Sequence, residues 1–204
     1  MSMTKVVALV VALAVGGVVA AQPAAGADVP AVASAATASA RAQRLNPPPP
    51  VTPVATQPET PIFPMQTTPR CAILDNFGDP RPGGRIHQGT DMLATLGQEV
   101  YAVVDGTLTE QIKVGDSNSS LSGNAWRLVA TGSKTYYFFM HLSAFAPGLS
   151  KGSVVKQGQL IGYVGDTGDA GPGNYHLHFE VHPNGGAAVN ALTVLTIPTG
   201  CTVS

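Results

Sequence analysis

The chain has 204 residues and a formal net charge of -1, with 11 basic and 12 acidic side chains that form no lysine or arginine cluster. A chain of this length holds one folded domain, with or without an extension. The near-neutral charge argues against binding to nucleic acid or to an anionic membrane surface through bulk electrostatics.

The first residues have the pattern of a secretory signal peptide. Lys5 precedes an apolar run of 16 residues, and the small residues Ala25-Gly26-Ala27 follow it. This order predicts a signal peptide over residues 1–27. An uncleaved membrane anchor is the alternative, but the run contains Gly16-Gly17 and is shorter than the roughly 20 residues that span a bilayer. We therefore expect a secreted, cell-wall or periplasmic protein with no stable membrane insertion after cleavage.

Residues 28–70 have the composition of a linker. Ala, Ser, Thr and Val dominate at first, and the stretch "NPPPPVTPVATQPETPIFPMQTTP" follows. Such a segment has too few large apolar side chains to offset the entropy of ordering, and its prolines favour extended conformations. A disordered linker is therefore predicted over residues 28–70 and a folded domain over residues 71–204. A spacer through a porous wall and a disordered leader are alternative interpretations of the linker.

The two cysteines, Cys71 and Cys201, lie at the first residue and near the last residue of the predicted domain. In an exported protein an even pair favours a disulfide over two free thiols. We therefore expect a Cys71–Cys201 disulfide that joins the two ends of the domain.

From Cys71 onward, short runs with two-residue alternation are separated by Gly, Asn, Asp and Pro. No window of a dozen residues has a sustained apolar period of 3.6 residues, so the pattern predicts an all-β sandwich or barrel-like core. The expected strands are Gln98–Val104, Thr107–Val114, Asn124–Ala130, Thr135–His141, Gln159–Val164 and His176–His182.

Four of the five histidines fall into three groups: His87 with Asp91 in "HQGTD", His141 alone, and His176 with His178. Taken singly, each group fits an ordinary surface or core histidine. In a strand, however, side chains two residues apart point to the same face, about 6.5–7 Å apart.

A bend at Gly89 would turn His87 and Asp91 toward one point. Two histidines and one carboxylate are a suitable ligand set for zinc, with a fourth position for water. The remaining histidine, His182, precedes a Pro-Asn-Gly turn and is expected at a strand end near solvent.

The stretches that carry these residues resemble one known family. "RIHQGTDM", "YFFMHLS" and "YHLHFEVHPNG", with "VKQGQLIGYVGDTG" between the last two, are similar to lysostaphin/LytM-type zinc endopeptidases of bacterial cell walls. The resemblance extends from about Phe77 to Leu195. It implies an antiparallel β-sheet core whose loops flank a zinc-containing groove. It also implies that His87, Asp91 and His178 bind the metal and that His141 and His176 are catalytic.

The chemistry implied by the resemblance is hydrolysis. Zinc lowers the pKa of a bound water from 15.7 to roughly 7 and polarises a carbonyl. A histidine near that water takes its proton or stabilises the developing oxyanion. The roles belong to His141 and His176 jointly, and the sequence does not assign base and stabiliser between them.

Three other side chains near these stretches have two interpretations each. Glu180 lies two residues after His178 and therefore on the same face of the predicted strand. It is either a partner of that ligand or, as we favour, a charge at a strand end. Arg81 and Arg85 lie in a proline-rich and glycine-rich turn, where a surface role is favoured over contact with a substrate carboxylate. Departures from the family pattern, Phe139 and Tyr175, remove neither a ligand nor a proton carrier.

The sequence thus predicts a secreted zinc metallopeptidase that hydrolyses peptide bonds in the stem peptides or cross-bridges of peptidoglycan, with one zinc ion per domain. A non-catalytic domain of the same fold that binds wall peptide or activates a partner hydrolase is the main alternative. Relatives of that kind usually lack some metal ligands, and this chain lacks none. A zinc peptidase that cuts a protein is a third possibility.

Overall fold

The computed structural model describes residues 60–204, so the predicted signal peptide and residues 28–59 of the predicted linker lie outside the described residues. Most of the regular structure in this part of the chain is extended. The strands are β1 (Ala72–Ile73), β2 (Pro80–Arg81), β3 (Arg85–Ile86), β4 (Thr90–Leu93), β5 (Glu99–Tyr101), β6 (Gly106–Ile112), β7 (Asn124–Ala130), β8 (Tyr136–Phe145), β9 (Val154–Val155), β10 (Leu160–Val164), β11 (His176–His182) and β12 (Thr202–Val203).

The helical elements are single turns: α1 (Ser119–Ser122) and the 3-10 turns η1 (Pro82–Gly84), η2 (Gly168–Ala170), η3 (Pro183–Gly185) and η4 (Ala191–Thr193). Across residues 60–204, none of these is long and apolar enough to cross a bilayer. The all-β prediction is confirmed.

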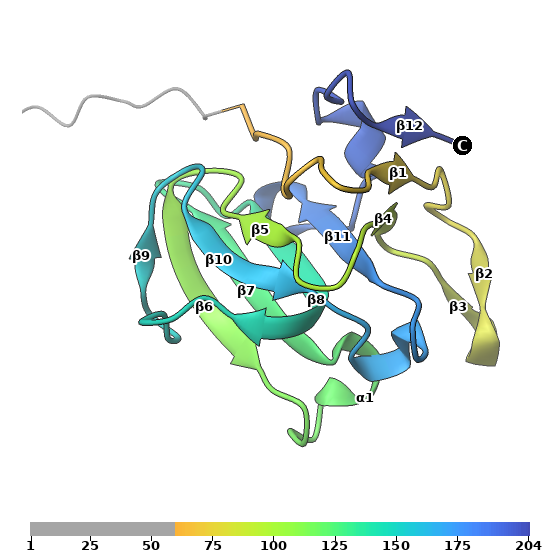
Figure 1. The fold of residues 1–204 in the computed structure, drawn as a ribbon. Helices are drawn as coiled ribbons and strands as arrows, with labels where there is room; N and C mark the ends of the chain where they lie inside the picture. The colour runs from red at the N-terminus through yellow and green to blue at the C-terminus, as the bar shows by residue number, and fades with distance from the viewer. Residues whose placement is uncertain (1–59) are drawn as a thin grey trace, which may run out of the picture. The chain divides into compact units, whose positions relative to one another are not determined.

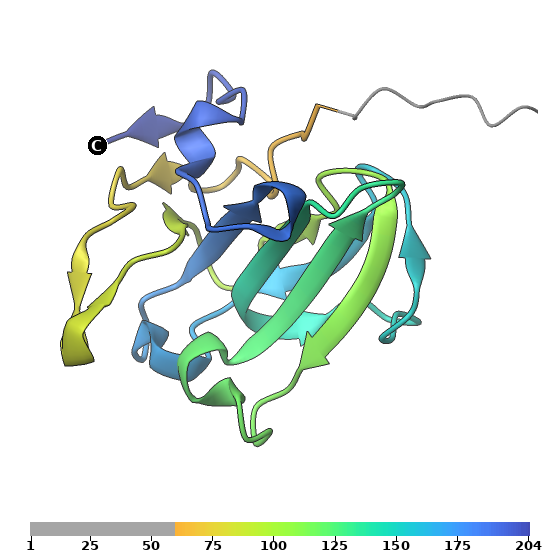
Figure 2. The same cartoon turned by 180° about the vertical axis from the view of Figure 1, so that it is seen from behind.

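Ten strands form one sheet, in which the order β12-β1-β4-β11-β8-β7-β6-β9 runs from one edge to the other (Figures 1 and 2). Its pairs are antiparallel except for β1 with β12. The first half of β8 lies between β11 and β7, and its second half also pairs with β10, which in turn pairs with β5. The sheet therefore folds over on itself and encloses a core, as the sandwich or barrel-like prediction requires.

Strand β11 is buried along its whole length because both of its faces are covered. Leu177, Phe179 and Val181 point into the hydrophobic core, where the ring of Phe179 lies 5.2 Å from that of Phe139. His176, His178, Glu180 and His182 alternate with them and point to the opposite face. One strand thus separates an apolar layer from a row of ionisable side chains.

All six expected strands begin within one residue of their predicted starts, and β7 and β11 have the predicted bounds. The prediction for residues 98–104 was too long, because only Glu99–Tyr101 forms a strand. Strand β4 was not predicted, although it carries Asp91. Its four residues are too few for an alternation pattern to stand out.

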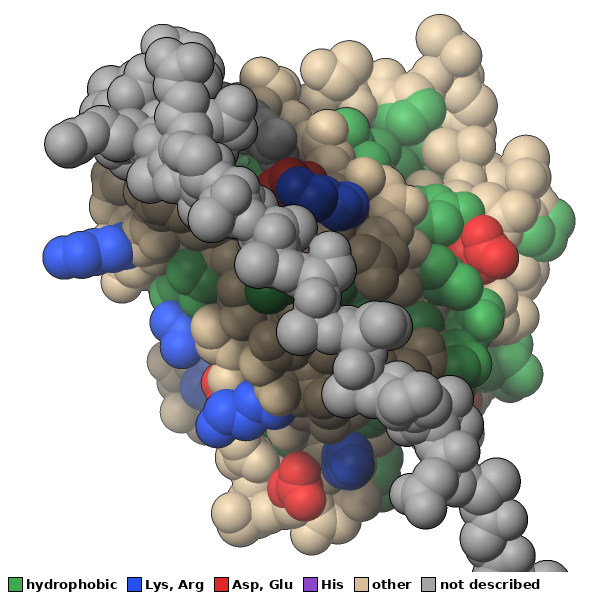
Figure 3. Space-filling view, turned by 90° about the vertical axis from the view of Figure 1, so that its left-hand side faces the viewer, with side chains coloured by type: hydrophobic (Ala, Val, Ile, Leu, Met, Phe, Trp, Pro, Cys, Tyr) green, Lys and Arg blue, Asp and Glu red, His purple; other side chains and the backbone are tan. Residues whose placement is uncertain are grey.

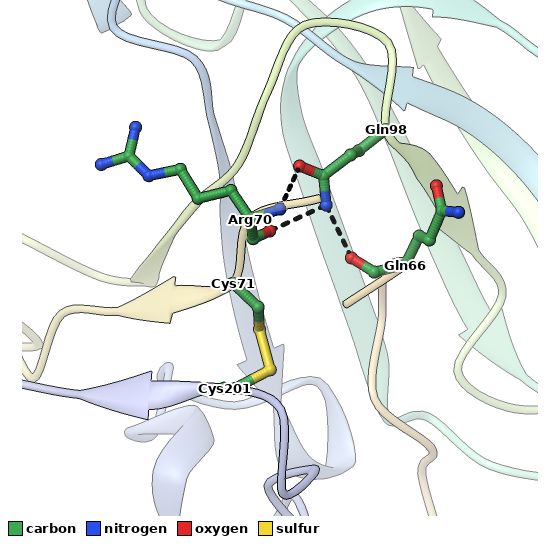
Figure 4. The surroundings of a disulfide bond; sticks show 5 residues. All are labelled: Gln66, Arg70, Cys71, Gln98 and Cys201. Atoms are coloured by element: carbon green, nitrogen blue, oxygen red, sulfur yellow. Dashed lines mark hydrogen bonds between the residues drawn. A yellow bond between two sulfur atoms is a disulfide. The ribbon is translucent and has the colours of Figure 1, made fainter. Parts of the chain in front are cut away.

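Residues 60–70 pack against the domain although they were assigned to the linker. Met65 is buried and bridges to Val100, and the backbone of Ile62 donates to the carbonyl of Val103. The side-chain amide of Gln98 accepts from the backbone of Arg70 and donates to carbonyls of this segment (Figure 4). Packing thus begins before the predicted boundary near Arg70.

The predicted disulfide between Cys71 and Cys201 is present (Figure 4). It lies beside the parallel pairing of β1 with β12, in which Ala72 is opposite Thr202. The end of the domain is therefore joined to its start by both a covalent bond and a strand pair.

Charged side chains are dispersed over the face shown in Figure 3. Most of the Lys and Arg side chains visible there lie on the left half of the view with Asp or Glu side chains beside them, and hydrophobic side chains gather on the right. This face presents no single-sign patch.

Candidate metal centre

The register of two strands brings Asp91 to His178. Strands β4 and β11 are antiparallel, and Asp91 is directly opposite His178 in the pairing. Side chains of directly opposite residues lie on the same face and within contact distance. The Oδ1 atom of Asp91 accordingly lies 3.0 Å from Nδ1 of His178.

Gly89 lets the chain carrying His87 approach β11. A Cβ atom on Gly89 would lie 2.4 Å from Nε2 of His178 and 2.9 Å from the carbonyl oxygen of Phe179, so only glycine fits. His87 therefore reaches the same point as Asp91, as the "HQGTD" spacing predicted. Its Nε2 atom lies 2.9 Å from Nδ1 of His178 and 3.2 Å from Oδ1 of Asp91.

These three atoms have the spacing of a zinc-ligand triangle. One ligand atom from each of His87, Asp91 and His178 lies within 4.8 Å of the others, and the three sides just described are 2.9, 3.0 and 3.2 Å. A tetrahedral site with ligands at about 2.0–2.1 Å has edges of about 3.3 Å. The donor set and its geometry thus fit zinc.

Each of the three side chains is held by a further hydrogen bond. The Nδ1 atom of His87 is 2.8 Å from the carbonyl of Asn76, and the amide of Asn76 donates to Oδ2 of Asp91 at 2.7 Å. The Nε2 atom of His178 is 3.0 Å from Oε1 of Glu180. Because these partners of the two rings are acceptors, each ring in its neutral form, the form that binds a metal, carries its hydrogen on the outer nitrogen. In that form the inner nitrogen has its lone pair available for a metal.

A bulge in β8 turns His141 toward the same point. Between the pairs Trp126–Phe139 and Asn124–Leu142, β8 advances three residues while β7 advances two. His141 has a positive φ of 63°, which is uncommon for a residue with a side chain. The extra residue and the unusual backbone break the alternation, so both Met140 and His141 line the groove.

His141 and His176 are oriented alike. Each points Nδ1 at a backbone carbonyl, that of Thr167 at 2.7 Å and that of Asn174 at 2.8 Å. Their ring centres are 4.7 Å apart, and Nε2 of His176 lies 3.6 Å from Oδ1 of Asp91. With the hydrogen on Nδ1, each ring has an Nε2 atom that accepts a proton.

The charges of the centre shift its pKa values in opposite directions. Burial opposes ionisation of Asp91, but hydrogen bonds from His178 and His87 outweigh burial and hold the carboxyl pKa well below its usual range. Burial also disfavours the charged form of His178, yet the hydrogen bonds to Asp91 and Glu180 raise its pKa to about 9. Burial, together with the neighbouring rings of His176 and His178, lowers the pKa of His141 to about 4.

The five side chains lie in a groove of about 1000 Å³. One wall is the hairpin β2–β3, which projects beyond β4 (Figure 1), and the other contains η2. Arg85 of the hairpin and Asp169 of η2 form an ion pair of 3.6 Å between these walls. The guanidinium of Arg81 is 3.4 Å from Oδ2 of Asp91, so Arg81 is not confined to the surface turn that was favoured for it.

Comparison with known proteins places this groove in a family. The sequence pattern of peptidase family M23 matches residues 85–191, a stretch that spans half of the chain and all five side chains of the groove. The chain belongs to peptidase family M23.

Individual relatives agree with this assignment. The M23 chain is 31% identical over 132 residues to an L-Ala–D-Glu endopeptidase of Bacillus subtilis, covering 61% of this chain and 38% of that protein. It is 35% identical over 103 residues to the peptidoglycan DD-endopeptidase ShyC of Vibrio cholerae, covering 50% and 21%.

Among solved structures, a zinc-containing peptidase from Vibrio cholerae is similar, with a TM-score of 0.51 and 28% identity over 62% of this chain and 37% of that one. The chain thus spans less than two fifths of each of these relatives.

The M23 domain also shows where the sequence-based interpretation was wrong. Glu180, favoured as a strand-end charge, is 8% exposed in the middle of β11 and bonds to both His178 and His182. These two hydrogen bonds outweigh its burial and lower its pKa. His182 ends the strand as predicted, but it is only 7% exposed and does not face solvent.

Sequence reasoning missed the groups that orient the M23 histidines. The carbonyls of Asn76, Thr167 and Asn174 accept from three of the rings, and a backbone carbonyl leaves no mark in a sequence. Only the Asn76 side chain offered a signal, as a polar residue ahead of the "HQGTD" segment.

Proposed function

We propose that this M23 domain is a zinc-dependent endopeptidase that hydrolyses peptide bonds in the stem peptides or cross-bridges of peptidoglycan. The observation that carries the proposal is the convergence of three zinc-type ligand atoms and two proton-accepting histidines in one groove. The names of its relatives, an L-Ala–D-Glu endopeptidase and a peptidoglycan DD-endopeptidase, support the substrate class.

His87, Asp91 and His178 would hold the zinc ion, through Nε2, Oδ1 and Nδ1 respectively. Zinc bound there supplies Lewis acidity, which acidifies water and polarises a carbonyl. The hydrogen bonds from Asn76 to Asp91 and from His178 to Glu180 keep the ligand atoms turned inward.

His141 and His176 would handle protons at Nε2. Their Nδ1 hydrogens are committed to the carbonyls of Thr167 and Asn174, so each ring takes a proton only on the nitrogen that faces the groove. One ring, neutral at Nε2, accepts the proton of the attacking water, and the other, when it already carries a proton on Nε2, donates that hydrogen to the carbonyl oxygen as negative charge builds on it. The two share these roles by position, and either assignment fits their 4.7 Å separation.

Export is the second half of the proposal. The predicted signal peptide over residues 1–27 would deliver the domain to the cell wall or periplasm, where peptidoglycan lies. A disulfide within the domain supports an oxidising compartment.

The test separates zinc binding from proton transfer. The purified chain should release new amines from isolated sacculi and lose this activity when zinc is chelated. His178→Ala should lose zinc and activity together, while His176→Ala should keep most of the zinc and lose the activity. Amine release that His178→Ala leaves unchanged would refute the zinc mechanism. A chain that binds sacculi, purifies without zinc and releases nothing would instead be a wall-binding domain.

A further inference from the structure

His182 is a buried histidine next to the metal centre that none of the proposed steps uses. It is 7% exposed and ends the row of side chains that His176, His178 and Glu180 begin on β11. Its Nε2 atom lies 2.8 Å from Oε2 of Glu180, and its Nδ1 atom lies 2.9 Å from the carbonyl of Gly186. Both partners are acceptors, so a neutral ring with its hydrogen on Nε2 donates to Glu180, and an imidazolium donates to both.

The ring of His182 is fixed in place from the neighbouring strand. Tyr136 is directly opposite His182 in the pairing of β8 with β11, and the two rings stack with centres 4.2 Å apart and planes at 11°. The guanidinium carbon of Arg127 lies 3.9 Å from the centre of the Tyr136 ring. A continuous series of contacts therefore runs from Arg127 on β7 to the metal centre on β11.

Glu180 connects this series to a metal ligand. Its two carboxylate oxygens have different partners: Oε1 accepts from Nε2 of His178, and Oε2 accepts from Nε2 of His182. A buried carboxylate held at both oxygens keeps one rotamer, whereas one held at a single oxygen is free to turn. The orientation of Oε1 toward His178 thus depends on the bond at Oε2.

His178 needs this support more than its neighbours do. His87, His141 and His176 present Nε2 to the groove and anchor Nδ1 on a backbone carbonyl, which is fixed by the fold. His178 alone among them presents Nδ1 to the ligand triangle, and its outer nitrogen is anchored on a side chain. A side-chain anchor holds a ligand only if it is itself held.

We propose that His182 is a positioning residue for the metal centre, because by holding Oε2 of Glu180 it keeps Nδ1 of His178 turned toward His87 and Asp91. The inference rests on the proposed zinc site. It assigns His182 no contact with substrate and no part in proton transfer.

The test measures zinc affinity in the full chain by competition with a chelator, together with the absorption spectrum of the cobalt-substituted protein. Outer partners of metal ligands typically contribute about 10–100-fold in affinity. His182→Leu is therefore expected to weaken zinc about 10-fold and to alter the cobalt spectrum. His182→Gln, whose amide can still donate to Glu180, should recover part of the affinity. If His182→Leu does not fold, His182→Asn is the second variant, because its amide is too short to reach Glu180.

Two comparisons exclude a merely structural role. Gln98→Leu removes a similarly buried side chain that precedes β5 and donates hydrogen bonds to residues 60–70, so it should lower thermal stability without changing zinc affinity or the cobalt spectrum. In a Glu180→Gln background, His182→Leu should have no further effect on zinc affinity, since its action passes through Glu180.

The inference is overturned if folded His182→Leu binds zinc as tightly as the unaltered chain. It is also overturned if His182→Leu weakens zinc binding equally with and without Glu180→Gln. Either result leaves the proposed function standing. Absence of zinc binding by the unaltered chain would instead refute the proposed function.

Discussion

The direction in which each histidine ring points decides what it can do in this domain. His87, His141, His176 and His182 point Nδ1 at the backbone carbonyls of Asn76, Thr167, Asn174 and Gly186. Only His178 turns Nδ1 inward. Its outer nitrogen has the carboxylate of Glu180 as a partner, and this reversal sets it apart from its neighbour His176 in the "HLH" sequence.

The close approach of Gly89 to His178 predicts that even one added methyl group weakens zinc binding. Gly89→Ala would place a carbon 2.4 Å from Nε2 of His178, so the backbone before β4 must move and carry His87 with it. Zinc affinity should fall by at least about 10-fold, as for other losses of ligand positioning. Gly200→Ala is the matched control, because a Cβ there meets nothing within 4 Å. Equal zinc affinity in the two variants would show that the close approach is not needed.

Zinc binding should depend on pH through His178. In the metal-free protein its pKa is raised to about 9, because its hydrogen bonds to Asp91 and Glu180 outweigh burial. The proton therefore stabilises the metal-free fold below the ordinary histidine pKa, and this contribution is lost as pH rises through about 9. Zinc must displace that proton, so its apparent affinity should rise about tenfold per pH unit toward pH 9. Calorimetry in buffers of different ionisation enthalpy would detect the released proton, and an affinity independent of pH would contradict the expectation.

At the scale of elements, two-residue alternation predicts which face each side chain of a regular strand occupies. It fails where a bulge interrupts the strand. Residues 176–182 were predicted with their bounds, and His176 and His178 share a face as alternation predicts, with Leu177 between them buried in the core. Parity alone would have placed His141 in the core with Phe139, and only the family resemblance placed it in the site. The bulge that turns His141 toward the groove arises from the pairing of β8 with β7. The sequence of β8 alone does not reveal that pairing.

The segment before β1 gives an element-scale prediction. Met65 is 2% exposed and belongs to the core, although its surroundings read as a linker. Met65→Ala should lower the free energy of unfolding by about 2–5 kcal/mol through lost burial and a cavity. Ile62→Ala is the control, because Ile62 is 37% exposed and its truncation should have a much smaller effect. Denaturant titration distinguishes them, and equal effects would mean that the segment does not pack as described.

At the scale of the whole molecule, the disulfide stabilises the fold by lowering the conformational entropy of the unfolded chain. Cys71 and Cys201 are 130 residues apart, so the bond closes nearly the whole domain into one loop. Replacing both by serine should lower the free energy of unfolding by about 4–5 kcal/mol on the chain-entropy model. The variant should still bind zinc where it is folded, because neither cysteine lines the groove. A change of less than about 1 kcal/mol would contradict the entropic account.

The central claim is that this M23 domain uses zinc to cut peptide bonds of peptidoglycan. The most direct measurement is mass spectrometry of the muropeptides that the purified chain releases from isolated sacculi, before chelation, after chelation and after zinc is restored. The proposal predicts products with a new amine and a new carboxyl at a peptide bond, absent after chelation and recovered with zinc. Intact peptides under all three conditions, or cleavage that persists without the metal, would contradict it.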